Sequence, residues 1–419
     1  MVRKITKKLK QINKSKKINK KNQSIQDGGR YLGQGSYGCV VTPALPCDKR
    51  TKSNKETKGK VSKIILKSSE TIDDEINISK KIKNLDKTGR YFVTFDDSCP
   101  LKTIPPERSN VASSRYLNNS NESRHVVLDR RKKLDVKYCP VDLTENPINI
   151  IMPYGGIDMY ELINNSEQTK FKIILKKAII QNIKSCFMNL VEGLYILHSN
   201  NVVLRDIKEE NIIANLIHKT NSRDISLDVR NIGQYSATLK YIDFGLSEHL
   251  TKSFTSNMEN IYRAGTETFI PPEIFITNDL NYYIKNEPQN IDEYFVFENV
   301  YSFLKQNTRD YLLALYEYET VKDFKQKIIN LYNQIFKEFQ NETTILNKYF
   351  GRNKMKYDGY LQKADIYALG LTIYEFLISC NVQIKNNRLL YDLLINMLNL
   401  DPNNRYNVIQ CLKHPYFTR

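Results

Sequence analysis

The sequence lacks tryptophan altogether and has only five histidines among its 419 residues. Its seven cysteines include no C-x-x-C pair, so the ligand spacing of a structural zinc site is missing. We therefore expect no zinc module, and free thiols as in a reducing compartment. The cysteines are Cys39, Cys47, Cys99, Cys139, Cys186, Cys380 and Cys411.

Long apolar runs are also missing. The longest one near the C-terminus, YALGLTIYEFLISC, contains Glu375 and is shorter than the roughly 20 residues that a membrane helix needs. The first residues show no apolar segment followed by a cleavage site, which a secretory signal would require. We expect an intracellular protein, cytoplasmic or nuclear, that is not secreted and has no transmembrane segment.

Acidic residues are absent from residues 1–26, which hold ten lysines or arginines. The chain carries a net charge of +17, so more than half of the excess lies in this tail, which we expect to be disordered. Clustered lysines attract phosphates without regard to sequence, so one interpretation is a weak contact with nucleic acid or an anionic surface. A solvated basic arm without a partner is the other interpretation, and the sequence leaves both open.

The remaining chain alternates between strand and helix patterns. The stretches YLGQGSYGCVV and KVSKIIL are rich in β-branched and aromatic residues and predict a β-hairpin. Residues 71–85 have the spacing of a short amphipathic helix, and INIIMPYGG predicts a strand that ends in a hinge. FMNLVEGLYILH predicts a buried helix, and the apolar residues of 276–357 recur every three or four positions, which favours helices.

A glycine-rich turn, GQGSYG, contains Gly33, Gly35 and Gly38. Without side chains, its backbone N–H groups could approach the phosphates of a nucleotide. The turn lies between two predicted strands, whereas a P-loop or a dinucleotide-binding motif connects a strand to a helix. Those two folds are therefore disfavoured, and a turn that only closes a hairpin remains an alternative.

Lys63 lies in the apolar strand VSKIIL, where a lysine needs either an exposed face or an anionic partner. Glu75 on the following helix is the first candidate for that partner, and Asp74 is the second. Two exposed, unrelated charges are the alternative.

Four polar residues follow the apolar VVL: Arg205, Asp206, Lys208 and Asn211. A second apolar strand, LKYID, ends at Asp243. If two neighbouring β-segments bring Asn211 and Asp243 together, their oxygens can bind Mg²⁺, and Asp206 stays free to accept a hydroxyl proton.

These motifs, in this order, resemble the eukaryotic-type protein kinase family from about residue 30 to the C-terminus. GQGSYGCV resembles G-x-G-x-x-G-x-V, VSK the lysine strand, and LRDIKEEN the H-R-D-x-K-x-x-N loop. DFG is intact, and GTETFIPPE resembles the segment that ends in A-P-E. ADIYALG and DPNNR resemble the family's later helix start and its closing arginine motif.

The resemblance implies that ATP and Mg²⁺ are bound. Lys63, paired with Glu75, would hold the α- and β-phosphates, Met152 would lie behind the adenine, and Asp158 would lie near the ribose. The residues implied for nucleotide binding are Gly33, Gly35, Gly38, Val40, Lys63, Glu75, Met152 and Asp158.

The resemblance also implies the catalytic residues. Asp206 would orient the substrate hydroxyl and accept its proton, Lys208 would contact the γ-phosphate, and Asn211 with Asp243 would hold Mg²⁺. Further implied roles are Thr266 bracing the substrate-side loop, Glu273 pairing with Arg405, and Asp365 fastening the catalytic loop.

The implied function is a serine/threonine protein kinase with a protein substrate, because Lys208 resembles the serine/threonine branch. The alternative is a pseudokinase scaffold that binds nucleotide or partner proteins without phosphoryl transfer. The bias toward Lys, Asn, Ile and Tyr resembles kinases of large DNA viruses. Loop phosphorylation and constitutive activity both remain open; the loop hydroxyls are Thr251, Ser253, Thr255 and Ser256.

The expected fold class is α+β, a bilobal protein kinase fold with a small antiparallel-sheet N-lobe carrying one helix, and a mainly helical C-lobe. The N-lobe is expected over 27–152 with an insertion at about 98–147. The C-lobe is expected over 153–419 with insertions at about 215–238 and 276–357, of which the last could recruit a partner. Leu204 replaces the family's usual histidine, without loss of a reacting group.

Overall fold

The structure is a computed structural model. The residues that it describes are 30–35, 38–45, 59–65, 71–101, 128–129, 132–133, 147–164, 169–219, 229–250, 265–276, 306–316, 321–340 and 354–419. The basic tail, most of the segment 98–147 and the loop hydroxyls from Thr251 to Ser256 therefore lie outside the described residues. The chain forms two compact units, residues 1–72 with 95–154 and residues 73–94 with 155–419.

Unit 1 is built on a five-stranded antiparallel sheet. Its strands, in spatial order, are β1 (Arg30–Gly35), β2 (Gly38–Thr42), β3 (Lys60–Ile65), β7 (Ile148–Pro153) and β4 (Asp97–Pro100). The hairpin and the strand INIIMP are as predicted, whereas β4 is a strand in a segment that the sequence led us to treat as loop. Its four residues include a proline and few apolar side chains, which hides the strand pattern.

The face of this sheet opposite Lys63 is covered by the chain itself. Ser62, Ile64 and Asn149 on that face are fully buried, although two of them are polar. The backbone N–H of Leu45 donates to the Ser62 hydroxyl at 2.7 Å, and the Asn149 amide donates to the Leu45 carbonyl at 2.9 Å. The chain after β2 therefore folds back over the sheet. The buried Ser62 and Asn149 side chains hydrogen-bond to the backbone of Leu45 there.

The prediction that all cysteines are free thiols is wrong. Cys39 on β2 and Cys99 on β4 are disulfide-bonded, and Cys186, Cys380 and Cys411 are free. β3 and β7 separate β2 from β4, a span of about 14 Å at normal strand spacing, so these two cysteines do not bond to each other. Spacing along the sequence could not reveal bonds that depend on which strands are neighbours.

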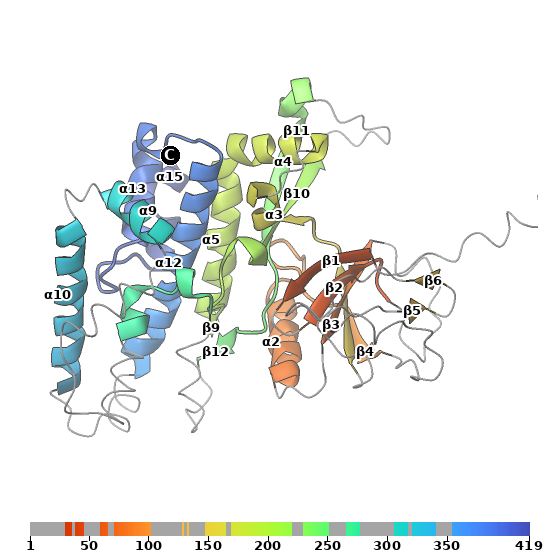
Figure 1. The fold of residues 1–419 in the computed structure, drawn as a ribbon, viewed down its shortest axis with the longest axis horizontal. Helices are drawn as coiled ribbons and strands as arrows, with labels where there is room; N and C mark the ends of the chain where they lie inside the picture. Colours follow the sequence, from red (N-terminus) through yellow and green to blue (C-terminus); the bar gives the residue numbers. More distant parts are fainter. Residues whose placement is uncertain are drawn as a thin grey trace, which may run out of the picture. The chain divides into compact units, whose positions relative to one another are not determined.

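Unit 2 is mainly helical (Figure 1). α5 and α12 run side by side through it, and α5 contributes eight buried residues to its core. Unit 2 includes α2 (Thr71–Leu85) except for its first two residues, which belong to unit 1. Its other α-helices are α3 (Met159–Asn164), α4 (Lys170–Gln181), α5 (Ile183–Ser199), α9 (Gln306–Tyr316), α10 (Val321–Gln340), α12 (Lys354–Ser379), α13 (Arg388–Met397), α14 (Val408–Leu412) and α15 (Pro415–Thr418).

Helix ends follow local sequence signals. α2 has the predicted bounds, with Asp73 and Asp74 in its first turn and Lys83 in its last, which complements the helix dipole. α14 begins with a capping box in which Asn407 and Gln410 each bond the other's backbone N–H.

Short strands and 3₁₀ turns of unit 2 carry the polar residues of interest. β10 pairs with β11 and with β8, and β9 pairs with β12. These elements are β8 (Ile157–Asp158), β9 (Val202–Val203), η2 (Glu209–Asn211), β10 (Ile212–His218), η3 (Val229–Gln234), β11 (Tyr235–Tyr241), β12 (Glu248–His249), η4 (Glu267–Phe269) and η5 (Ile384–Asn386).

The segment 276–357 contributes helices to the core of unit 2. α9 and α10 are helical as predicted, and their apolar faces are buried, including Leu312, Phe324 and Ile328. The Tyr316 hydroxyl of α9 donates to the Ile395 carbonyl of α13 at 2.9 Å. α12 begins at Lys354, well before the expected start near Asp365, because the helical pattern extends back into residues that we had assigned to the insertion.

Among the residues that the structure describes, no helix combines the length and apolar character that crossing a bilayer requires.

Candidate active site

The loop that joins β9 to η2 is held from below by a buried carboxylate. Asp365 on α12 accepts the backbone N–H of Leu204 at 2.8 Å through Oδ2, and that of Arg205 at 2.8 Å through Oδ1. His198 of α5 also lies 3.0 Å from Oδ2 through its Nε2. Asp365 thus fastens the loop as predicted, and the buried Leu204 packs in the core without needing a polar partner for its side chain.

Asp206 is the centre of a short hydrogen-bond chain. The Thr266 hydroxyl donates to its Oδ1 at 2.7 Å, and the Asn211 amide donates to its Oδ2 at 2.9 Å. The Lys208 ammonium lies 3.0 Å from the same Oδ2 and donates to the Thr266 hydroxyl at 2.7 Å. Three residues from two segments, Thr266, Asn211 and Lys208, therefore hold one carboxylate in a fixed orientation.

Asn211 and Asp243 are brought together by the β10–β11 pair. The backbone N–H of Ile242 donates to the Asn211 carbonyl at 3.0 Å, directly beyond the last pair of the ladder. Asp243 has a left-handed backbone with φ of 59°, and its Oδ1 accepts the N–H of Gly245 at 3.3 Å. The neighbouring β-segments that we predicted do place these two residues side by side.

The pair fits a magnesium ion by its donor chemistry. The Asn211 amide nitrogen donates hydrogen bonds to both the carbonyl and Oδ2 of Asp206. The amide oxygen is therefore the atom of this side chain that could bind a metal ion. The described residues contain no cluster of three or more His, Cys, Asp or Glu side chains suited to a metal. Mg²⁺ often takes only one or two protein ligands beside water and phosphate, so Asn211 and Asp243 suffice.

Arg205 has a buried side chain that pairs with a partly exposed glutamate. Its side chain is only 8% exposed and its backbone has a φ of 70°, a conformation that costs energy in a non-glycine residue. Its guanidinium lies 3.2 Å from Oε2 of Glu248 on β12. The strand pair β9–β12 thereby ties the residue before Asp206 to the segment after Asp243.

A buried glutamate, Glu209, pairs with the half-buried Glu375, a contact that the sequence did not suggest. Glu209, next to Lys208, is buried, and burial raises its pKa strongly; a hydrogen bond with Glu375 of α12 raises the pKa further. Burial and the contact with Glu375 thus both favour the protonated form of the Glu209 carboxyl. Of the two adjacent acids, Glu209 is buried beside Glu375 of α12, whereas Glu210 is exposed.

Asp158 has a structural role in addition to its predicted one. Its Oδ1 accepts the N–H of Glu161 at 2.6 Å and so caps the start of α3. Burial raises the pKa of the Asp158 carboxyl despite this hydrogen bond, and the nearby Glu161 and Glu210 act in the same direction. Its contact with a ribose stays a prediction.

Unit 1 carries the other predicted nucleotide-binding residues. Gly33 pairs with Val40 and Gly35 with Gly38 in the β1–β2 ladder. A Cβ at Gly38 would lie 2.1 Å from the Ile64 carbonyl, so only glycine fits there. Lys63 pairs with Val40, which puts both side chains on one face of the sheet.

Met152 lies on the same face as Lys63. It pairs with Val61, two residues before Lys63 on β3, so the three side chains share a face of the sheet. Each unit thus gathers its own share of the predicted residues: unit 2 contains Glu75, Asp158, Asp206, Lys208, Asn211 and Asp243, and unit 1 contains the rest.

Glu75 lies against the turn that follows Asp243. A Cβ placed on Gly245 would be 3.3 Å from Oε2 of Glu75 and 3.4 Å from Oδ1 of Asp243. The two carboxylates therefore flank Gly245, and a side chain at that position would crowd both.

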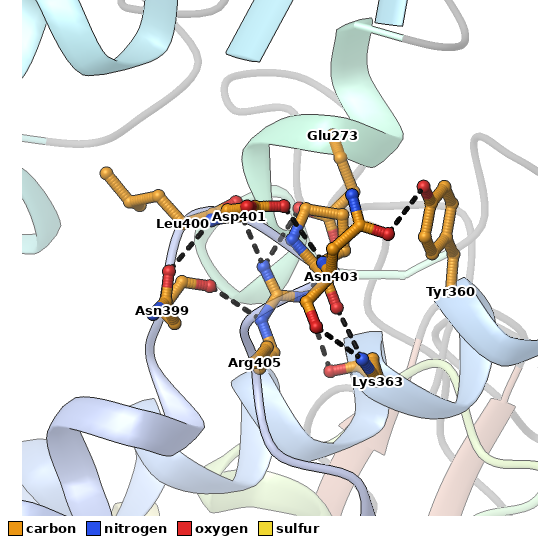
Figure 2. Close-up of polar contacts among 9 residues, drawn as sticks. Glu273, Tyr360, Lys363, Asn399, Leu400, Asp401, Asn403 and Arg405 are labelled. Carbon is orange, nitrogen blue, oxygen red and sulfur yellow. Dashed lines mark hydrogen bonds and ion pairs between the residues drawn. The ribbon is translucent and has the colours of Figure 1, made fainter. Parts of the chain in front are cut away.

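Figure 2 shows the second buried anchor of unit 2, around Arg405. Its guanidinium makes a bidentate ion pair with Glu273 at 2.5 and 2.9 Å, as predicted, and both side chains are fully buried. The remaining N–H groups reach the carbonyls of Asn399, Lys363 and Leu400. All five donors of the guanidinium are therefore used.

This arrangement agrees with a comparison against family models. Residues 136–287, which include Asp206, Asn211, Asp243 and Glu273, match the model described as "Protein kinase domain". The chain contains a protein kinase domain. Its fold is the α+β fold expected for that domain, with an antiparallel N-terminal sheet, a helix and a mostly helical C-terminal part.

Curated relatives are distant. The chain is 30% identical over 107 residues to the DNA damage response protein kinase DUN1 of Saccharomyces cerevisiae, which covers 25% of this chain and 20% of that protein. It is 32% identical over 202 residues to calcium-dependent protein kinase 6 of Plasmodium berghei, covering 47% of this chain and 11% of that protein.

A third relative is the serine/threonine-protein kinase nekl-2 of Caenorhabditis elegans, 27% identical over 159 residues, or 37% of this chain and 38% of that protein. The chain thus spans well under half the length of each relative. These relatives are cellular proteins, so they do not support the resemblance to viral kinases that composition suggested.

Proposed function

We propose that the chain is a serine/threonine protein kinase that transfers the γ-phosphate of MgATP to a protein hydroxyl. The observation that supports this most is the geometry around Asp206. A carboxylate offers about four lone-pair positions. Thr266 takes one on Oδ1, and Asn211 and Lys208 take two on Oδ2. One position on Oδ1 is left for the hydroxyl of a substrate.

Asp206 would align that hydroxyl and accept its proton as the new P–O bond forms. Lys208 is tied to both Asp206 and Thr266, so its charge would stand next to the transferred phosphoryl group and offset the developing negative charge. Mg²⁺ bound by Asn211 and Asp243 would neutralise the β- and γ-phosphate oxygens.

In unit 1, the backbone around Gly33, Gly35 and Gly38 would cover the phosphates, and Lys63 would bind their α- and β-oxygens. Val40 and Met152 share the Lys63 face and would contact the adenine. Asp158 would accept a hydrogen bond from the ribose with the oxygen that does not cap α3.

Serine or threonine as the acceptor is supported by the Lys208–Asp206 contact and by one relative, nekl-2, which is named a serine/threonine-protein kinase. The physiological substrate would be a protein. The apolar faces of α9 and α10 are already buried. A partner that binds at 276–357 would therefore contact the polar faces of these helices or the residues of this segment that the structure does not describe. An intracellular location and a weak anionic contact of residues 1–26 remain expectations.

The test is transfer of labelled γ-phosphate from MgATP to generic protein substrates by the parent, Asp206→Asn and Asp243→Ala. We expect transfer by the parent and a loss of roughly three orders of magnitude or more in both variants, because each removes a group at the reacting centre. Equal incorporation by all three proteins would refute the catalytic assignment. Nucleotide binding without transfer by the parent would support a pseudokinase scaffold instead.

A further inference from the structure

Two bonded cysteines lie in one row across the sheet of unit 1. Cys39 of β2 is opposite Ile64 of β3. Asn149 of β7 is opposite Ile64 on one side and Cys99 of β4 on the other. Directly opposed residues of antiparallel strands point to the same face of a sheet. Both cysteines are therefore on the face away from Lys63, with Ile64 and Asn149 between them.

The sequence leaves only two cysteines as partners for this pair. Three strand spacings, about 14 Å, separate Cys39 from Cys99, roughly twice the Cα separation that a disulfide spans. The cysteines of unit 2 are free thiols, namely Cys186, Cys380 and Cys411. Cys47 and Cys139 remain of the seven, and both lie outside the described residues. Cys39 and Cys99 therefore belong to two separate disulfides, each with one of these partners.

The chain directly after β2 indicates which partner belongs to which cysteine. The Leu45 N–H donates to the Ser62 hydroxyl of β3 at 2.7 Å, and the Leu45 carbonyl accepts from the Asn149 amide of β7 at 2.9 Å. At Leu45 the chain thus runs across the covered face from β3 to β7, in the direction of β4. Cys47 follows two residues later, within about 7 Å of Leu45.

This direction favours a bond between Cys47 and Cys99. Cys99 is one strand spacing, about 5 Å, beyond Asn149, whereas Cys39 is two spacings, about 10 Å, on its other side. Cys47 can reach Cys99 without a change of direction, and the chain would have to turn back across β3 to reach Cys39. Cys39 is then left with Cys139, which precedes the start of β7 by about nine residues, a reach of about 30 Å.

We propose that unit 1 carries two disulfides, Cys47–Cys99 and Cys39–Cys139, that fasten its sheet and make nucleotide binding depend on the redox state. Each bond forms when two thiols give up two protons and two electrons to a low-molecular-weight disulfide, which is reduced to two thiols. A dithiol reverses the reaction and is itself oxidised to a disulfide. The pairing is independent of the proposed function, whereas the consequence for ATP rests on it.

The position of Cys39 connects its bond to the nucleotide side of the sheet. Cys39 is fully buried and directly precedes Val40, whose side chain shares the Lys63 face. Gly38, on its other side, approaches the Ile64 carbonyl so closely that no Cβ fits there. The bond at Cys39 therefore holds the β1–β2 hairpin from the face opposite Lys63. Its loss would let the hairpin move away from β3.

The free thiols of unit 2 provide an internal control. Burial raises the pKa of the Cys186 thiol to about 12, and its Sγ donates to the Ala237 carbonyl at 3.3 Å. Burial also raises the pKa of the Cys380 and Cys411 thiols. Because the thiolate is the form that attacks a disulfide, these three residues should not take part in the exchange. A redox response of the folded protein would then come from unit 1.

Peptide mapping tests the pairing. The full chain is equilibrated with oxidised and reduced glutathione, alkylated under denaturing conditions and digested without reduction, and linked peptides are identified by mass spectrometry. We expect the links Cys47–Cys99 and Cys39–Cys139, and alkylation of the three cysteines of unit 2. A link between Cys39 and Cys47 would overturn the assignment of partners. Alkylation of all seven cysteines would overturn the disulfides themselves.

Serine variants test whether the cysteines act as pairs. Cys47→Ser and Cys99→Ser, alone or together, should each lower the thermal midpoint of the oxidised protein by the same amount, about 5 °C or more, because all three variants lose one shared bond. Cys139→Ser should add a separate loss. Cys380→Ser is the matched control, because Cys380 is a half-buried free thiol of unit 2. Losses that add up for Cys47 and Cys99 would contradict their bond.

Nucleotide binding measures the consequence. Reduction of the parent with a dithiol should weaken MgATP binding about tenfold and speed amide exchange in β1, β2 and β3, whereas α5 and α12 should exchange as before. Cys139→Ser should behave like the reduced parent without any reductant. Unchanged MgATP binding after complete reduction would overturn the redox dependence.

These measurements also separate the two proposals. If the oxidised parent binds MgATP but transfers no phosphate, the proposed function fails while the redox dependence of binding stands. If it binds no MgATP, both the proposed function and the redox dependence fail, and the peptide map still decides the pairing.

Discussion

Unit 2 contains two buried charges that anchor loops, and they do so in opposite ways. Asp365 is an anion that accepts hydrogen bonds from two backbone N–H groups and lies beside His198, under the loop that carries Asp206. Arg405 is a cation that collects acceptors, a carboxylate and three carbonyls, near η4. The anion is balanced mostly by dipoles, whereas the cation is balanced by a full opposite charge. Removing the cation therefore takes a bidentate ionic partner from a buried carboxylate, whereas removing the anion takes no full charge from a partner.

The sharpest test of this difference is Arg405→Met. It removes the bidentate ionic partner of the buried Glu273, which should lower the free energy of unfolding by about 3–5 kcal/mol. Equilibrium denaturation followed by far-UV circular dichroism measures it. Arg405→Lys should lose less, because an ammonium restores the charge but not the five fixed donors. A Met variant as stable as the Lys variant would contradict the role of the charge.

A smaller effect is expected for Asp365→Asn. Leu204 and Arg205 donate to different oxygens of Asp365, and asparagine replaces one of these oxygens by an NH2 group, so one buried N–H loses its partner at a cost of about 1–3 kcal/mol. Because that loop carries Asp206, kcat for phosphoryl transfer should fall more than KM changes. Asp310→Asn, at an exposed position on α9, is the control. An unchanged kcat in Asp365→Asn would show that the hydrogen bonds of Asp365 are not needed for phosphoryl transfer.

The comparison extends to Arg205, whose anion Glu248 is partly exposed. Glu248→Gln keeps a hydrogen bond but removes the charge, so we expect a loss of about 1 kcal/mol, discounted for solvent screening, and a modest fall in kcat. The matched control is Glu267→Gln, an exposed glutamate of η4. Thermal unfolding and initial rates are the measurements. If both variants behave alike, the Glu248–Arg205 pair contributes neither to stability nor to the reaction rate.

The smallest effect concerns Asp158, an anion whose burial is incompletely compensated. Because the pKa of this carboxyl is raised in the folded protein, the unfolded chain loses the proton at a lower pH than the folded one. The free energy of unfolding therefore falls as pH rises past the ordinary aspartate range. Asp158→Asn keeps an oxygen for the α3 cap and should remove this pH dependence. Asp158→Ala should instead lose about 1 kcal/mol with the cap. Denaturation at pH 4, 6 and 8 tests both; matching curves for parent and Asn would argue against the raised pKa.

Prediction from the sequence succeeded where short-range pattern was enough. α2 has the bounds that its spacing predicted, and the β10–β11 pair joins Asn211 to Asp243 as expected. It failed where distant segments decide the outcome. β4 forms because β7 offers an edge, and Glu209 points inward because α12 offers Glu375.

Residue type and order along the chain were sufficient to predict the kinase-like fold and the polar residues that the structure brings together around Asp206, because each motif is local. They could not decide which charges are buried, which cysteines are bonded, or that α2 packs with the helical unit. Those outcomes depend on contacts between residues far apart in the chain, such as Asp365 with Arg205 and Tyr91 with Tyr241. Burial and hydrogen bonding are properties of that packing, and they set the energy of each charge.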